Sequence, residues 1–172
     1  MEFMDVLLKR RSTRKFNGEK ITNGEMEKVL HAGLLAPSSM NRKPISLMVV
    51  ENKKTLEELS KAKDHGAELL AGADKAIVVL ADTMISDTWC EDSSIVLTYL
   101  HLAATDLNLG SCWVQIHMRQ KDGVYAEEVV RDILKIDNHY RIAGMLALGH
   151  SDDIPDAHSL EDVDKTRIHF LV

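Results

Sequence analysis

The apolar residues of this chain recur in two patterns. Apolar positions three and four residues apart lie on one face of a helix, and they predict helices at residues 2–9, 22–36, 54–72, 87–107 and 125–136. Short runs rich in apolar and β-branched residues predict strands at residues 45–51, 75–82, 111–117, 140–150 and 166–172. The chain is therefore expected to fold as helices that alternate with short strands.

Two predicted helices carry further signals. Thr22 stands three residues before Glu25, which is the spacing of a capping box and predicts where the second helix begins. The helix at 87–107 is apolar on most faces in its second half, so we expect other parts of the protein to surround it. Residues 151–165 are polar and acidic and predict turns.

The composition fits one compact domain over residues 1–172, because 45% of the residues are hydrophobic and only three are proline. The formal net charge of −6 argues against a nucleic-acid partner, since such partners require an extended basic surface. The longest apolar-rich stretch, 93–110, is interrupted by His101 and Asp106 and is too polar to span a membrane. The first cations, at residues 9–11, follow the first apolar residues, which is the reverse of a secretory signal and predicts a cytoplasmic protein.

Basic residues gather in the stretch KRRSTRKF at residues 9–16, which holds five cations. Arginine offers forked donors and serine a short polar contact, so this stretch can surround a phosphate. The candidate phosphate ligands are Arg10, Arg11, Ser12 and Arg14. Cations after a helix end also complement the helix dipole, and that role stays open for each arginine.

Three further segments carry candidate binding residues. The loop APSSMNRKP at 36–44 offers hydroxyls and an amide that can hydrogen-bond a polar heteroaromatic edge or a ribityl chain, although the same residues build ordinary turns. In LGSCWVQIH, Trp113 can form the wall of a flat ligand site and Gln115 can reach its polar edge, or the tryptophan can belong to the core. Near the C-terminus, Lys165 or Arg167 can add a cation to the phosphate site or mark a solvated strand edge.

Several common kinds of site are not predicted. The eight histidines are scattered, and neither they nor Cys90 and Cys112 have the spacing of metal ligands, so we expect no metal site. The chain has no Walker A sequence, no GxGxxG and no GxSxG, which argues against a separate dinucleotide-binding domain and a hydrolase elbow. A Cys112 nucleophile with a histidine partner stays open.

Four stretches together resemble one family. RRSTRKF, APSSMNRKP, LGSCWV and ALGH occur in the order and approximate spacing of the nitroreductase family of flavoproteins, over about residues 3–170. The resemblance implies an α+β fold with a mainly antiparallel central sheet flanked by helices. It also implies an intertwined homodimer with one FMN per subunit at the dimer interface. The anion bound by the basic stretch is then expected to be the FMN phosphate.

The resemblance also implies a role for each motif. The basic stretch would contact the phosphate, ribityl chain and ring edge, and the loop after the second helix would reach the flavin of the other subunit. The segment around Trp113 would run along the isoalloxazine, and a late basic residue would lie near the phosphate. The implied residues are Arg10, Arg11, Ser12, Arg14, Pro37, Ser38, Ser39, Asn41, Trp113, Val114, Gln115 and Arg167, or Lys165 in place of Arg167.

The sequence departs from the family pattern at a few positions. Lys43 stands where many relatives carry glutamine, and Gln115 and Ile116 stand where they carry a glycine pair. Longer members place an asparagine and a lysine on the pyrimidine edge of the flavin, from the region where this chain has His65 and Glu68. The chain is also short for the family, so the identity of the substrate is not implied.

The function implied by the resemblance is that of an FMN-dependent oxidoreductase. It would take hydride from NADH or NADPH and reduce a small acceptor, such as a nitroaromatic, a quinone or a flavin, with ping-pong kinetics and no obligatory acid or base side chain. One alternative is a related flavin enzyme that dehalogenates its substrate or consumes reduced flavin. Others are a flavin-binding module without catalysis, and a basic patch at residues 9–15 that docks an acidic partner.

Overall fold

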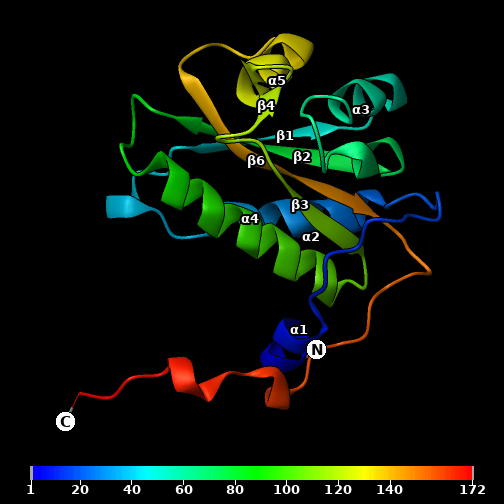
Figure 1. Cartoon of the computed structure of the whole chain (residues 1–172), viewed down its shortest axis with the longest axis vertical. Helices are drawn as coiled ribbons and strands as arrows, with labels where there is room; N and C mark the ends of the chain where they lie inside the picture. The colour runs from blue at the N-terminus through cyan, green and yellow to red at the C-terminus, as the bar shows by residue number, and fades with distance from the viewer. Residues whose placement is uncertain (1, 172) are drawn as a thin grey trace.

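The computed structural model describes residues 2–171 and is built around a four-stranded sheet (Figure 1). The strands stand in the order β1-β2-β6-β3, and each neighbouring pair is antiparallel. Their bounds are Ile45–Val50 for β1, Lys75–Asp82 for β2, Gly110–Gln115 for β3 and Tyr140–Gly149 for β6. The mixed fold with a mainly antiparallel sheet is therefore confirmed.

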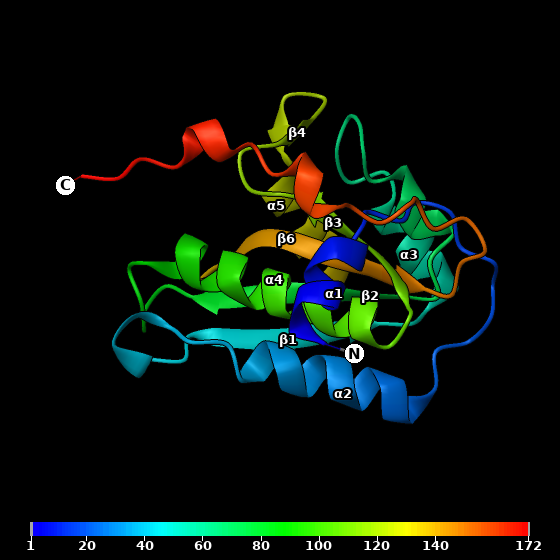
Figure 2. The same cartoon turned by 90° about the horizontal axis from the view of Figure 1, so that it is seen from below.

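Helices cover both faces of this sheet. Helices α2 and α4 lie on one face and α3 and α5 on the other, while α1 packs against α4 (Figure 1, Figure 2). The helices span Phe3–Lys9 (α1), Asn23–Leu34 (α2), Lys53–Leu59 (α3), Trp89–Asp106 (α4) and Ala126–Leu134 (α5). Short 3-10 turns span Ser39–Asn41 (η1), Glu68–Ala71 (η2), Leu160–Asp162 (η3) and Lys165–Arg167 (η4).

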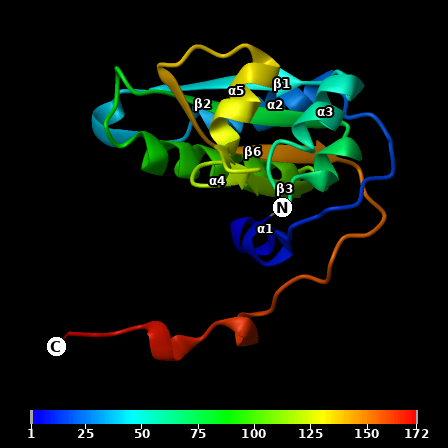
Figure 3. The same ribbon diagram turned by 45° about the horizontal axis from the view of Figure 1, so that its top comes forward.

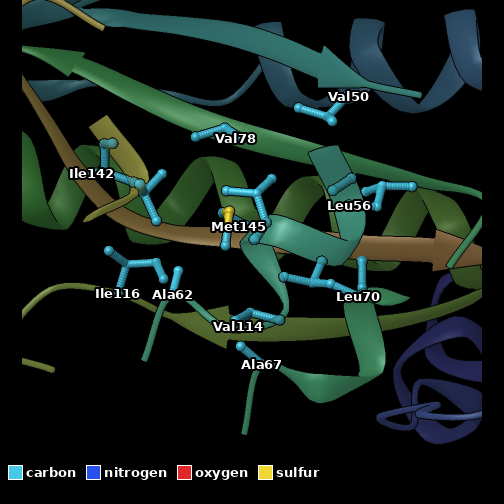
Figure 4. Packing of buried hydrophobic residues seen from close by; sticks show 14 of the residues in the cluster. Val50, Leu56, Ala62, Ala67, Leu70, Val78, Val114, Ile116, Ile142 and Met145 are labelled. Atoms are coloured by element: carbon cyan, nitrogen blue, oxygen red, sulfur yellow. The ribbon is translucent and has the colours of Figure 1, made fainter. Parts of the chain in front are cut away.

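Alternate residues of β2 belong to two different cores. Ile77 and Val79 pack with α2 and α4, whereas Val78 packs with Met145 of β6 and Leu56 of α3 (Figure 4). Successive side chains of a strand point to opposite faces, so a strand buried on both faces is apolar at every position. This explains why residues 76–81 form an unbroken hydrophobic run.

The helix signals in the sequence have visible counterparts. Thr22 Oγ accepts a hydrogen bond from the Glu25 amide at 3.2 Å, and the Glu25 carboxylate accepts one from the Thr22 amide at 2.8 Å, which confirms the capping box. Helix α4 buries Leu97 and Leu100, but Tyr99 is 40% exposed. Residues 2–171 of one chain therefore cover only part of this apolar helix.

Two sequence expectations are wrong. Residues 54–72 do not form one helix, because α3 ends at Leu59 and a turn with a glycine at positive φ precedes η2. Residues 166–171 form no strand: η4 ends at Arg167 and the residues after it are exposed, while position 172 lies outside the described residues. A strand needs a neighbour for its backbone groups, and this tail extends away from the sheet (Figure 3).

The structure also contains a small hairpin that the sequence patterns do not predict. Strands β4 (Gln120–Lys121) and β5 (Val124–Tyr125) are joined by Asp122 and Gly123, whose φ angles are 49° and 84°. Two successive positive φ angles are the geometry of a type I′ turn, for which Asp-Gly is favoured. The strands are too short to produce a visible apolar pattern.

Candidate functional site

The basic stretch leaves α1 as an extended arm that runs along β3. Ser12 forms a parallel bridge with Ser111, and the Thr13 amide donates to the Ser111 carbonyl at 2.9 Å. Gly110 permits this approach, because a Cβ there would lie 2.8 Å from Thr13 Cγ2. The arm is therefore fixed against the edge of the sheet.

Arg10 contacts a buried histidine of α4. Its Nη1 lies 3.3 Å from His101 Nε2, and the other ring nitrogen of His101 is hydrogen-bonded to Ser111 Oγ. Burial, and then the Arg10 charge, lower the pKa of His101 from 6.5 to about 4. The ring is therefore neutral at pH 7 and leaves the charge of Arg10 uncompensated.

Arg14 and Trp113 line one hollow with a volume of about 490 Å³. Cys112 lines it too, and burial raises the pKa of this thiol, although the charges of Arg14, Lys63 and Arg10 oppose the rise. Arg14, Lys63 and Arg10 thus contribute positive charge around Cys112. The raised pKa argues against Cys112 as an activated nucleophile.

Gln115 holds the Trp113 indole in place. The indole Nε1 donates to Gln115 Oε1 at 2.9 Å, and Gln115 Nε2 donates to the His117 carbonyl at 3.0 Å. Lys63 Nζ donates to the Gln115 carbonyl at 3.0 Å, and burial lowers the pKa of Lys63. Val114 is fully buried in the core, so its side chain serves packing.

Of the candidate cations within residues 2–171, Arg14 lines this hollow, whereas Arg10, Arg11, Lys165 and Arg167 do not. The Arg11 guanidinium donates to the carbonyl of Asp156, in the segment that returns past α1. Lys165 and Arg167 belong to the exposed tail, which lies beyond α1 in Figure 1. In a single chain, the arm contributes Arg14 to the lining of the hollow, and Arg10 is held against His101 instead.

The loop between α2 and β1 is held by specific hydrogen bonds. The Ser39 amide donates to the buried carboxylate of Asp92 at 2.8 Å, and Ser38 Oγ accepts from the Lys43 amide at 2.9 Å. Asn41 and Lys43 both have positive φ, at 55° and 51°. The loop therefore has a defined path at the beginning of α4.

This loop and the arm lie at different ends of α4. The loop contacts Asp92 and the arm contacts His101, nine residues further along the helix. At a rise of 1.5 Å per residue, these two contacts are about 14 Å apart along the helix axis. The predicted site residues of the loop are Pro37, Ser38, Ser39 and Asn41. Within one chain, the fold does not bring them to the arm.

A larger cavity of about 900 Å³ lies between α5 and the segment after β3, and no predicted site residue lines it. Its lining includes Glu127, whose carboxylate accepts from Arg131 at 3.1 Å, Arg141 at 2.7 Å and the Ile142 amide at 2.9 Å. One carboxylate thus bridges two guanidinium groups. This network joins α5 to β6, so these charged residues have a structural role in holding the two elements together.

Comparison with known proteins identifies the family. The sequence model of the nitroreductase family matches residues 7–89 and 60–150. The chain belongs to the nitroreductase family. A relative from Archaeoglobus fulgidus, provisionally named NADH dehydrogenase/NAD(P)H nitroreductase, is 31% identical over 98% of this chain and 97% of its own length.

Solved structures agree with this assignment. An FMN-dependent nitroreductase from Clostridium difficile is 36% identical, covers 97% of this nitroreductase and 98% of its own chain, and superposes with a TM-score of 0.94. A nitroreductase from Desulfitobacterium hafniense, solved with bound FMN, shares the fold with a TM-score of 0.76 at 23% identity, over 100% of this chain and 99% of its own.

Two residues that contact predicted site residues, His101 beside Arg10 and Lys63 beside Gln115, are not themselves predicted from the sequence of this nitroreductase. His101 interrupts an apolar helical stretch, which is a visible signal that it has a polar partner. Lys63 is one of several cations in its segment, and nothing in the sequence distinguishes it. Among the described residues, no cluster of three or more metal-ligating side chains occurs and no helix is long and apolar enough to cross a membrane.

Proposed function

We propose that this nitroreductase binds FMN between its N-terminal arm and β3, and uses it to pass electrons from NADH or NADPH to a small acceptor. The observation that carries the proposal is one hollow lined by Arg14 and Trp113, on the sheet edge to which the arm is bound through Ser12 and Ser111. A cation for a phosphate and a flat surface for an aromatic ring therefore meet at one place.

The residues present fit this group. Within residues 2–171, Arg10 bonds a neutral ring and Arg14 bonds the Ser12 carbonyl at 3.4 Å, so neither is paired with a carboxylate. Glu68 lines the same hollow, but its carboxylate accepts a hydrogen bond from the Gly66 amide, so the charge of both arginines is available to an anion. The Trp113 indole, held by Gln115, supplies a rigid apolar surface.

The proposal includes a homodimer in which the loop at 37–41 and the tail of one chain complete the site of the other. It is supported by the separation of loop and arm along α4, and by apolar side chains left open to solvent. Phe3 is 65% exposed, Leu35 79% and Phe170 85%. An apolar hollow of about 410 Å³ between α1 and α4 offers room for a partner's side chains.

In this mechanism the protein binds and orients, and FMN, when bound, supplies the hydride chemistry. Arg10, Ser12 and Arg14 would hold the phosphate and ribityl end, and the segment from Trp113 to Gln115 would hold the ring. Positive charge around the hollow favours a ligand that gains negative charge on reduction. No acid or base side chain is required. Donor and acceptor would use the same open face of the ring, so they would bind in turn and give ping-pong kinetics. The enzyme would act in the cytoplasm.

The test begins with the FMN-free protein, to which FMN is added while its fluorescence is followed. Arg10→Ala and Arg14→Ala are each expected to weaken binding about ten- to hundredfold, because hydrogen bonds to charged groups contribute about 1.5–3 kcal/mol. Lys54→Ala, an exposed cation of α3, is the control and should leave the affinity unchanged.

Catalysis is then tested on the FMN-loaded protein. Anaerobic NADH or NADPH should bleach the flavin absorbance, and initial rates with a quinone acceptor should give parallel double-reciprocal lines. Bound flavin that neither nicotinamide bleaches would indicate a binding module instead. Failure to bind FMN at all would leave the basic arm as a docking patch for an acidic partner.

A further inference from the structure

His101 is a buried polar residue on an otherwise apolar helix. It is 6% exposed and lies between Leu100 and Leu102 on α4. Its ring is hydrogen-bonded to Arg10 of the arm and to Ser111 of β3, the two segments of the proposed FMN site. A packing role alone would be filled by an apolar side chain at lower cost in desolvation. The ring therefore has a role that depends on its hydrogen bonds and not only on packing.

The partners of the ring define where its proton lies. A guanidinium group has donors only, so His101 Nε2 must accept the bond from Arg10 and cannot carry a hydrogen. In the neutral ring the hydrogen is then on Nδ1, which donates to Ser111 Oγ. Ser111 thus selects the tautomer that Arg10 needs.

A neutral acceptor has an effect that a carboxylate would not have. Either group would orient the Arg10 guanidinium and reduce the rotamer freedom it loses when a ligand binds. A carboxylate would also neutralise the arginine and compete with an anionic ligand, whereas the neutral ring orients the guanidinium and leaves its charge available. Burial and the adjacent cation keep the ring neutral, since they lower the pKa of His101 to about 4.

We propose that His101, fixed by Ser111 as the Nδ1–H tautomer, is a positioning residue that orients Arg10 toward the anionic end of FMN. This inference rests on the proposed FMN site. It makes Ser111 and His101 a relay from the sheet to the arm, so that one hydroxyl of β3 determines the direction of a guanidinium on a different segment.

The tautomer is measured first, in FMN-free protein labelled with ¹⁵N histidine. At pH 7, the His101 ring should show a protonated Nδ1 and an unprotonated Nε2. Ser111→Ala removes the acceptor of the Nδ1 hydrogen and should shift the ring toward the Nε2–H tautomer. An unchanged tautomer in this variant would show that Ser111 does not select it. An Nε2–H ring in the wild-type protein overturns the proposal, whatever FMN does.

FMN binding supplies the second readout. His101→Leu is expected to weaken FMN affinity about tenfold, and His101→Gln, which retains an acceptor near the position of Nε2, should recover most of that loss. In an Arg10→Ala background, His101→Leu should cause no further loss, because the residue to be oriented is gone. Circular dichroism on each variant confirms that it is folded.

The outcomes separate the two proposals. If folded wild-type protein does not bind FMN, the proposed function fails. If wild-type protein binds FMN and Arg10→Ala weakens binding, but His101→Leu does not, the positioning role alone is overturned. An equal loss from His101→Leu with and without Arg10 also overturns it, since the effect would then be general packing.

Discussion

The buried His101 should make the stability of the FMN-free protein depend on pH in a defined window. Its pKa is about 4 in the folded chain, against an ordinary value of 6.5. Above pH 6.5 the ring is neutral in both states and pH has no effect through it. Below pH 6.5 the unfolded chain takes up a proton that the folded chain refuses, so stability falls until pH 4 and then levels off.

The expected size follows from the shift. Each unit of pKa difference corresponds to about 1.4 kcal/mol, so the full loss is about 3 kcal/mol, of which about 2 kcal/mol is lost by pH 5. The ring is only 6% exposed, so solvent screening removes little of this effect. A loss of this size is a large fraction of the stability of a small domain.

Urea unfolding at pH 7, 6, 5 and 4 measures the effect when wild-type protein is compared with His101→Gln. Carboxylates such as Asp74 and Glu25, whose pKa values are lowered in the folded chain, also titrate at low pH, but they are present in both proteins and cancel in the difference. The wild-type protein should lose about 2 kcal/mol more than the variant between pH 7 and pH 5. Parallel stability profiles for the two proteins would refute the reasoning.

Three further changes test other parts of the structure. Asp92→Ala removes the acceptor of the Ser39 amide and should lower the free energy of unfolding by about 2 kcal/mol in urea, and no loss would show that the loop is held by other contacts. Gly110→Ala places a Cβ against Thr13, so it should lower the free energy of unfolding by about 1–3 kcal/mol and also weaken FMN binding. Unchanged FMN affinity would contradict the inference that the arm must be held against β3. Glu127→Gln leaves two guanidinium groups without their shared charge, and thermal unfolding should show a loss of about 3 kcal/mol; an unchanged midpoint would mean that this network is not stabilising.

Much of the fold could be predicted because its signals are local. The capping box at Thr22 depends on four consecutive residues, and the run at 76–81 is apolar throughout because its strand is covered on both faces. The tail at 166–171 has a strand-like composition, but a strand also needs a neighbour, which no local pattern reveals.

The site was less predictable because it depends on contacts between distant segments. The sequence indicated Arg10 and Arg14 as phosphate ligands, yet the acceptor that orients Arg10 lies 91 residues away on α4. Arg11 is part of the same basic stretch, but its guanidinium donates a hydrogen bond to the carbonyl of Asp156 and does not line the hollow. Identical residue types therefore acquire different roles through tertiary contacts that spacing does not encode.

The loop and the arm are separated along α4, so in the proposed dimer each site would contain the arm of one chain and the loop of the other. Two different defective chains should then complement each other. A chain with Arg10→Ala and a chain with a disrupted loop at 37–41 would each bind FMN weakly when expressed alone. In the mixed assembly, one site would collect both lesions and the other would contain none. Coexpression of the two defective chains would then restore FMN binding at one of the two sites of each mixed dimer.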